Sequence, residues 1–219
     1  MEKDKWAGET ESFLKQRLSE GSYLSSHRDA LAYRLEHSYR VADIGRQIAR
    51  KEGCDETEMT VACLLHDIAY CEDFGENGWK DHGRRSAAIA RPFLAGLGIP
   101  GDRIDDICYG IAMHVDGEAD RDGEPTPFAL TVGDADNIDR FGAYRIHETL
   151  CLDRFLRKSL RGKREYVSAR LSRLENLMDM QMGTAAAKEM WTERIRYYME
   201  FLRKLGDQLD RSGPVTGHS

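Results

Sequence analysis

The chain has 219 residues and a formal net charge of −6, so it is long enough for one sizeable hydrophobic core and too acidic for a typical nucleic-acid binder. No apolar run approaches the ~20 residues that cross a bilayer, and the charged N-terminus lacks the apolar centre of a signal peptide. Five cysteines without a Cys-x-x-Cys pair fit reduced thiols in a cytoplasmic protein better than a disulfide framework.

The first half of the chain shows helical periodicity. Apolar residues follow His37 at positions 41, 44 and 48, along one face of a helix that we expect to end at Gly53. The sequence DETE at 55–58 has the spacing of a capping box and opens the next helix, which carries an apolar face from 61 to 68. A polar loop over 72–81 then leads to a helix over 82–97, in which Pro92 is expected to cause a kink or a break.

The rest of the chain is also predicted to be helical. A helix starts at Asp102, and an acidic loop separates it from long helices near 127–160, 164–182 and 184–208. We therefore expect an all-α helical bundle that forms a single domain over 1–219. Its core would lie at about 30–140, with the helices of 141–208 packed on it.

One apolar run carries two adjacent ionisable groups. In CLLHDIAY at 63–70, His66 and Asp67 lie within a stretch built to be buried. An unpaired buried polar group costs roughly 2–7 kcal/mol, so a compensating partner is needed. His37, His114 and Asp136 also fall on inward helix faces. A single such histidine is more often an ordinary core residue, but a bundle can direct several of them at one metal ion.

Three segments together resemble the HD-domain metal-dependent phosphohydrolases: EHSYRVADIGRQIA at 36–49, CLLHDIAY at 63–70 and DADNID at 134–139. The resemblance implies an HD-type helical bundle in which His37, His66, Asp67 and Asp136 bind the metal, with Asp134 as the competitor of Asp136. The order His, His-Asp, His, His, Asp also resembles the members that bind two metals. In these, His82 and His114 would serve the second ion, and Asp67 would bridge both.

The family implies hydrolysis of a phosphate ester or anhydride of a small metabolite, with a nucleotide preferred, by a metal-activated water. The divalent ion would be Mn, Mg, Ni, Co, Zn or Fe, with one or two ions bound. Asp67, His82 and His114 would be catalytic, Asp67 by orienting the water or taking its proton and the histidines by contacting phosphate. Lys80, Arg84 and Arg140 are the expected substrate-binding cations, because they lie close in sequence to the proposed ligands.

Two other functions are compatible with this pattern. Some two-metal HD proteins, such as myo-inositol oxygenase and its phosphonate-cleaving relatives, use paired iron and O₂ on a small polyol or phosphonate. Other HD modules bind a nucleotide as a signal without catalysis, although these usually lack a ligand and all four expected positions are filled here. The C-terminal helices are suited to a homodimer.

Overall fold

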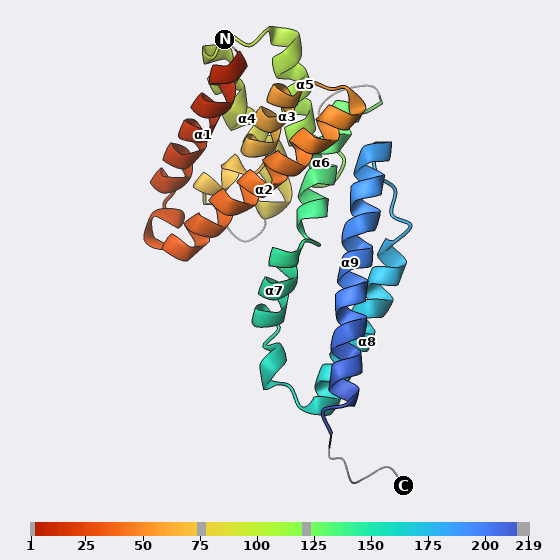
Figure 1. Cartoon of the computed structure of the whole chain (residues 1–219). Coiled ribbons are helices and arrows are strands. Elements are labelled where there is room, and N and C mark those ends of the chain that lie inside the picture. Colours follow the sequence, from red (N-terminus) through yellow and green to blue (C-terminus); the bar gives the residue numbers. More distant parts are fainter. Residues whose placement is uncertain (1–2, 74–77, 120–123, 214–219) are drawn as a thin grey trace. The chain divides into compact units, whose positions relative to one another are not determined.

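The computed structural model describes residues 3–73, 78–119 and 124–213. Within these ranges the chain forms nine α-helices, several short 3₁₀ helices and no strand, which confirms the predicted all-α class (Figure 1). None of the described helices is long and apolar enough to cross a membrane. The chain separates into two compact units, of which the first comprises 1–139 with 182–187 and the second 140–181 with 188–219. That the whole chain acts as one domain stays a prediction.

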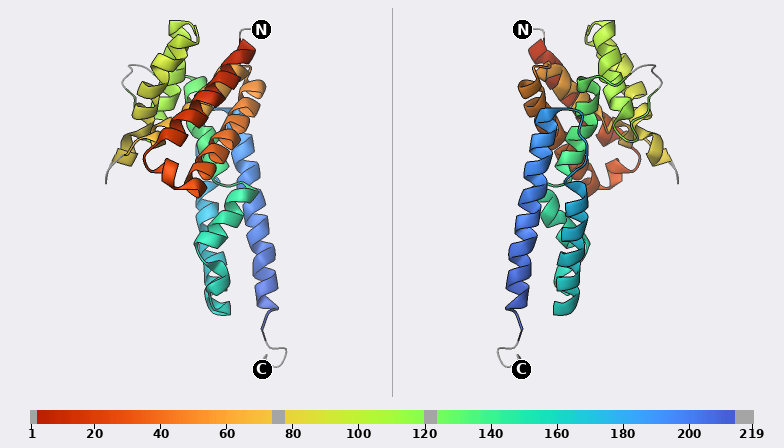
Figure 2. Two further views of the ribbon diagram at one scale, coloured as in Figure 1. Left: turned by 90° about the vertical axis from the view of Figure 1, so that its left-hand side faces the viewer. Right: turned by 90° about the vertical axis from the view of Figure 1, so that its right-hand side faces the viewer.

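The first unit contains six of the helices. They are α1 (Lys3–Glu20), α2 (Arg28–Glu52), α3 (Glu56–Leu65), α4 (His82–Gly96), α5 (Gly101–Met113) and α6 (Pro127–Asp139). Helix α2 packs on α3 and α6, and α5 packs on α4 and α6, so their inner faces enclose one core (Figures 1 and 2). Fully buried side chains such as Ile48, Leu65, Ile107 and Ile138 come from four of these helices, which places the centre of the core between them.

Local signals set the ends of α2 and α3. Gly53 ends α2 in the left-handed conformation (φ 72°), which glycine adopts at little cost. The carboxylate of Asp55 then accepts hydrogen bonds from the backbone N–H groups of Thr57 and Glu58, as expected for the residue that caps α3. The Glu58 side chain is buried and accepts a hydrogen bond from Arg103 of α5 at 2.9 Å. The same cap thus starts α3 and ties it to α5.

Helices α4 and α5 approach each other closely at Gly83. A Cβ atom on this residue would lie 2.5 Å from the carbonyl oxygen of Ala112, so only glycine fits there. Helix α4 also continues through Pro92, where we expected a kink or a break. The proline removes one N–H donor from the helix without ending it. The α4–α5 contact brings His82, the first residue of α4, next to His114, which directly follows α5.

The second unit contains α7 (Ala143–Leu152), α8 (Leu160–Leu177) and the main part of α9 (Ala185–Asp210). Helices α8 and α9 lie side by side and antiparallel (Figures 1 and 2). The indole N–H of Trp191 donates to the carbonyl of Leu177 at 2.9 Å, and Arg164 donates to the carbonyl of Leu209 at 2.9 Å. These bonds tie each end of α8 to the opposite end of α9.

The prediction of one continuous helix over 127–160 is wrong. Helix α6 ends at Asp139, and α7 begins after Gly142, whose backbone is extended (φ −76°, ψ 168°). A glycine inside a helix costs about 1 kcal/mol relative to alanine, which makes this a favourable place to leave the helix. The neighbouring Phe141 packs edge-on against Trp191, with ring centroids 4.9 Å apart, and thus belongs to the second unit.

Candidate metal centre

Six polar side chains that the sequence marks come together inside the first unit, and each is at most 9% exposed. Four of them lie at helix ends. His66 and Asp67 follow α3, His114 follows α5, and His82 is the first residue of α4. The other two, His37 and Asp136, lie within α2 and α6 and face inward.

A hydrogen bond of the same kind orients His66 after α3 and His114 after α5. The Nδ1 atom of His66 lies 2.7 Å from the carbonyl of Cys63, and that of His114 lies 2.7 Å from the carbonyl of Ile111. A carbonyl only accepts, so each Nδ1 carries the proton. The last carbonyls of a helix have no N–H partner within the helix, so those of Cys63 and Ile111 can accept hydrogen bonds from these imidazoles. In the neutral rings the Nε2 lone pairs then point into the site.

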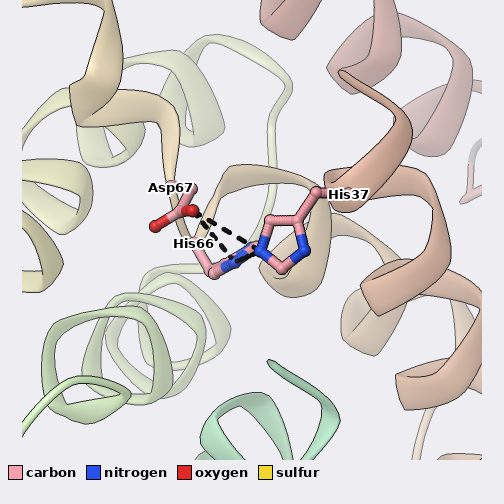
Figure 3. A group of neighbouring side chains, drawn as sticks. All are labelled: His37, His66 and Asp67. Carbon is pink, nitrogen blue, oxygen red and sulfur yellow. Dashed lines mark hydrogen bonds and ion pairs between the residues drawn. The ribbon is translucent and has the colours of Figure 1, made fainter. Parts of the chain in front are cut away.

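The first group of potential ligands is His37, His66 and Asp67, drawn in Figure 3. The two Nε2 atoms lie 3.2 Å apart, and Oδ2 of Asp67 is 3.6 Å from each of them. Asp136 joins this group from α6, with its Oδ1 3.2 Å from Nε2 of His37. Four side chains from three separate parts of the chain thus direct nitrogen or oxygen atoms at one small volume.

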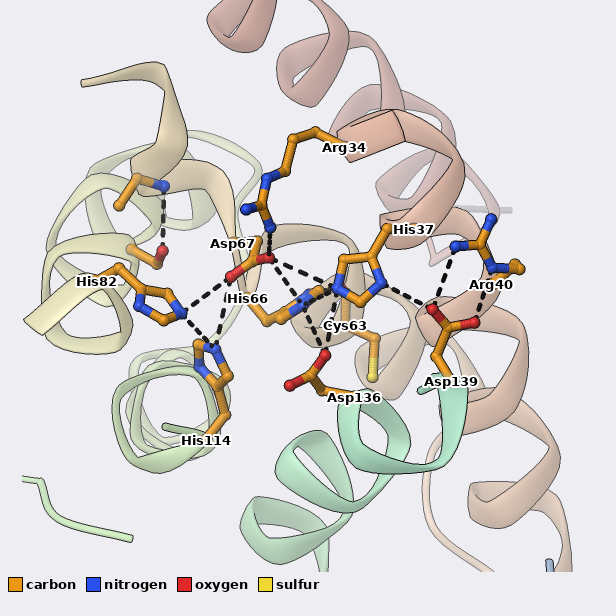
Figure 4. A network of polar contacts seen from close by, with 12 residues as sticks. Arg34, His37, Arg40, Cys63, His66, Asp67, His82, His114, Asp136 and Asp139 are labelled. Atoms are coloured by element: carbon orange, nitrogen blue, oxygen red, sulfur yellow. Dashed lines mark hydrogen bonds and ion pairs between the residues drawn. The ribbon is translucent and has the colours of Figure 1, made fainter. Parts of the chain in front are cut away.

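The second group is Asp67, His82 and His114 (Figure 4). Here the other carboxylate oxygen is used: Oδ1 of Asp67 is 3.1 Å from Nε2 of His82 and 3.6 Å from Nε2 of His114. The two histidine Nε2 atoms are 3.1 Å apart. Asp67 therefore belongs to both groups, with one oxygen in each.

Both groups have the chemistry of a divalent metal site. Imidazole nitrogens and carboxylate oxygens are ordinary ligands of first-row divalent ions. Within each group the ligand atoms lie within 4.8 Å of one another. Backbone hydrogen bonds direct the Nε2 lone pair of His66 into the first group and that of His114 into the second, so each group presents lone pairs that a cation would bind. The residues fit one or two ions.

A carboxylate from α6 orients His37. Oδ2 of Asp139 lies 2.9 Å from Nδ1 of His37, and Arg40 in turn donates two hydrogen bonds to the Asp139 carboxylate, at 2.7 and 3.2 Å. Burial raises the pKa of Asp139, but the bonds from His37 and Arg40 outweigh it, and the pKa lies below its ordinary value. Asp139 thus stays charged and holds the His37 ring with Nε2 toward the metal centre.

We expect Asp139→Asn to weaken Mn²⁺ binding about 10- to 100-fold, because an amide holds the imidazole less firmly and adds no negative charge to it. Calorimetric titration of the metal-free protein with Mn²⁺ measures this. The control is Asp105→Asn, which removes an exposed carboxylate that pairs with Arg91 outside the site. An unchanged dissociation constant for the Asp139 variant would show that the His37 ring is held by its packing alone.

Arg34 contributes a positive charge at the edge of the site. Its Nη1 donates to Oδ2 of Asp67 at 2.7 Å, and its guanidinium lies 3.3 Å from the centre of the Tyr70 ring. Burial raises the pKa of Asp67, but His66, the bonds from His114 and His82, and the Arg34 charge together hold it well below the usual range. Asp67 is therefore a carboxylate at neutral pH, as a metal ligand must be.

His37 and His66 differ in charge in the metal-free protein. Burial lowers the pKa of His37, but hydrogen bonds to Asp136 and Asp139 and the charge of Asp67 outweigh it and raise the pKa to about 9. Burial dominates for His66 and lowers its pKa to about 4. At neutral pH His37 is thus protonated and His66 is neutral, so metal binding must displace a proton from His37.

In ¹⁵N-imidazole NMR of the metal-free protein, we expect one histidine to titrate near pH 9 and to disappear from the spectrum of His37→Gln. Because an unfolded histidine has a pKa of about 6.5, the raised value stabilises the fold below that pH, and the stabilisation is lost as pH rises through 9. The His66 signal should stay neutral down to about pH 4. A His37 signal that titrates near 6.5 would contradict this assignment.

The remaining predicted residues lie as follows. The carboxylate of Asp134 does not face the histidines but accepts a hydrogen bond from the backbone N–H of Gly183 at 2.8 Å, and burial raises its pKa to about 6. Lys80 and Arg140 are exposed, and Arg140 belongs to the second unit. Arg84 binds Asp81 and Asp116. Substrate contacts of these three cations stay predictions.

Sequence reasoning missed Arg34 and Asp139, which contact predicted ligands directly. Arg34 precedes His37 by three residues and Asp139 follows Asp136 by three, so each lies one helical turn from a predicted ligand and on about the same face. This three-residue spacing from a predicted ligand is the sequence signal by which both residues could have been found.

Comparisons with known proteins find similarity over the part of the chain that carries this site. The family model described as HD domain matches residues 34–140. A deoxyguanosinetriphosphate triphosphohydrolase-like protein of Bifidobacterium longum is 49% identical over 45 residues, which are 20% of this chain and only 9% of that protein.

Solved structures share the fold over most of the chain. YpgQ of Bacillus subtilis in complex with ADP is 23% identical, with a TM-score of 0.65 and coverage of 95% of this chain and 97% of that one. An HD-superfamily hydrolase from Bacillus thuringiensis is 21% identical, with a TM-score of 0.66 and coverage of 95% and 98%. A predicted HD superfamily hydrolase from an uncultured Thermotogales bacterium is 20% identical, with a TM-score of 0.64 and coverage of 91% of each chain.

Proposed function

This chain carries an HD domain over residues 34–140, and on that premise we propose that it is a metal-dependent phosphohydrolase that acts on a nucleotide. The observation that carries the proposal is the position of Asp67, a buried carboxylate with one oxygen among His37 and His66 and the other between His82 and His114. A carboxylate shared in this way suits a site for one or two divalent ions at which an anionic substrate reacts with water.

In the proposed mechanism, His37, His66, Asp67 and Asp136 would hold the first ion. A divalent cation, once bound, lowers the pKa of a coordinated water and offsets the charge of the phosphoryl group. The chain's own contribution is to position the reactants. Asp67 would orient the attacking water or accept its proton; either role needs a deprotonated carboxylate, which the lowered pKa of Asp67 provides.

His82 and His114 would either complete a second ion site with Asp67 or donate hydrogen bonds to phosphate oxygens. Arg34, which pairs with Asp67, has further N–H donors that would bind an oxygen of an anionic substrate. Asp139, which is held by Arg40, keeps the His37 ring oriented toward the first ion.

Two comparisons support a nucleotide as the substrate. YpgQ, which shares the fold, was crystallised with ADP, and the short match in Bifidobacterium longum is to a protein named for triphosphohydrolase activity on a deoxynucleotide. The products would be inorganic phosphate, pyrophosphate or triphosphate, depending on which bond is cleaved.

A nucleotide panel tests the proposal. We expect the purified protein to release phosphate, pyrophosphate or triphosphate from at least one nucleotide with Mn²⁺, Mg²⁺, Ni²⁺ or Co²⁺, and to lose this activity in EDTA. Tight nucleotide binding without turnover under any of these metals would instead indicate a sensing module.

The second group of ligands also favours one other function, a di-iron oxygenase, because Asp67 with His82 and His114 could hold a second iron. Metal analysis of protein prepared without oxygen, followed by an O₂-consumption assay with small polyols and phosphonates, separates the two. Two irons per chain with O₂ uptake would favour the oxygenase, and a non-iron metal with phosphate release would exclude it.

A further inference from the structure

A cavity of about 380 Å³ lies in the first unit beside the metal centre. We call it the tyrosine pocket, after the side chains that shape it: Tyr23, Tyr33, Arg34, Tyr70, Glu72 and Asp73. Its volume is within the range of about 300–1,000 Å³ that small-molecule sites occupy. The mechanism proposed above uses none of its tyrosines.

Arg34 connects the pocket to the metal centre. The guanidinium lines the pocket, donates to Oδ2 of Asp67 and covers the Tyr70 ring at 3.3 Å. Figure 4 shows this side chain reaching Asp67 from the α2 side. A guanidinium has five N–H donors in a plane, more than one carboxylate oxygen can accept, so it suits a phosphate that lies between the pocket and the ions.

Two of the tyrosine rings also pack against histidines of the centre. The rings of Tyr33 and His37 are parallel within 3°, with centroids 6.0 Å apart. The rings of Tyr70 and His82 have centroids 5.3 Å apart. The pocket therefore touches both ligand groups, and a molecule inside it would have its reacting end at the metal centre.

The outer wall presents an aromatic surface to solvent. Tyr23 is 58% exposed although its ring stacks on His27 at 4.0 Å, so a large ring is held in place without being buried. Aromatic walls of this kind stack with planar rings, and stacking of one base contributes about 1–3 kcal/mol. Glu72, whose carboxylate also pairs with Arg85, and Asp73 line the pocket with hydrogen-bond acceptors, which suit the amino group of a base or the hydroxyls of a sugar.

We propose that the tyrosine pocket holds the base of the nucleotide while its phosphates extend past Arg34 to the metal centre. This proposal rests on the proposed function for the identity of the ligand but concerns different residues. It implies that Tyr23 and Tyr33 determine the preference for a nucleotide over a simple phosphate compound.

The test compares ADP with inorganic pyrophosphate, which has the same reacting group and no base. Calorimetric titration in the presence of Mg²⁺ gives both dissociation constants. We expect the wild type to bind ADP more tightly than pyrophosphate, and Tyr23→Ala and Tyr33→Ala each to reduce this preference about tenfold. Tyr39→Ala is the matched control, since this residue is also a half-buried tyrosine of α2 but lines a different cavity.

The outcomes separate the two proposals. Equal affinity of the wild type for both ligands, or a loss in the variants that is equal for ADP and pyrophosphate, would overturn the pocket assignment. If the variants lose affinity for ADP but not for pyrophosphate, and the wild type hydrolyses no nucleotide, the pocket assignment stands and the proposed phosphohydrolase function is wrong. Because Tyr23 is exposed, its variant is expected to fold even if Tyr33→Ala does not.

Discussion

Replacement of Asp67 by asparagine is expected to lower kcat by at least about a thousandfold and to remove tight metal binding. The amide keeps the shape of the side chain but loses the charge that both ligand groups share, and it can accept no proton from water. Nucleotide hydrolysis with Mn²⁺, together with metal analysis of the purified variant, measures both effects.

The control is Asp43→Asn, which changes an exposed carboxylate of α2 that pairs with Arg46. Because Asp67 is buried and pairs with Arg34, its variant is also compared with the wild type by thermal denaturation. His114→Gln provides a second variant that leaves the Asp67–Arg34 pair intact. If the folded Asp67 variant hydrolyses nucleotides at the wild-type rate, the metal centre described here is not the active site.

Gly83→Ala is expected to lower the free energy of unfolding by about 1–3 kcal/mol and to reduce activity, although residue 83 binds no ligand. The added Cβ would lie 2.5 Å from the carbonyl oxygen of Ala112, which is backbone and cannot rotate away. Helices α4 and α5 would have to separate, and His82 and His114 would move apart with them. Urea denaturation measures the loss of stability.

Gly96→Ala is the matched control. It lies at the end of the same helix, and a Cβ there would meet no atom within 4 Å. This variant should keep full activity and gain a few tenths of a kcal/mol in stability, because alanine favours a helix over glycine. Equal stability of the two variants would mean that α4 and α5 adapt to the extra methyl group.

Much of the site could be predicted from local sequence. His66 and Asp67 interrupt an apolar run, and polar residues in such a place need a strong partner. The choice between Asp134 and Asp136 could not be derived in the same way. Residues two apart on a helix are separated by about 200° around its axis, so the two carboxylates face different ways. Asp134 and Asp136 are nevertheless both buried, so an inward position did not by itself identify the ligand.

Long-range pairs limited the rest of the prediction. Arg34 and Asp67 are 33 residues apart, and His37 and Asp139 are 102 apart, so nothing local links them. The end of α6 was missed for a related reason. The pattern around Phe141 is compatible with a continuing helix; Gly142 is a local signal for the break, but the packing of Phe141 against Trp191, fifty residues later, is not visible in the local sequence.

The bond between Asp134 and Gly183 has a practical consequence for truncation. Residues 182–187 belong to the first unit although they follow most of the second in the chain. A gene cut after codon 139 would leave the Asp134 carboxylate buried without its amide donor, and Glu52 without the N–H of Ala186. An isolated first unit should therefore be designed by joining 139 to 182 through a flexible linker instead of by simple deletion.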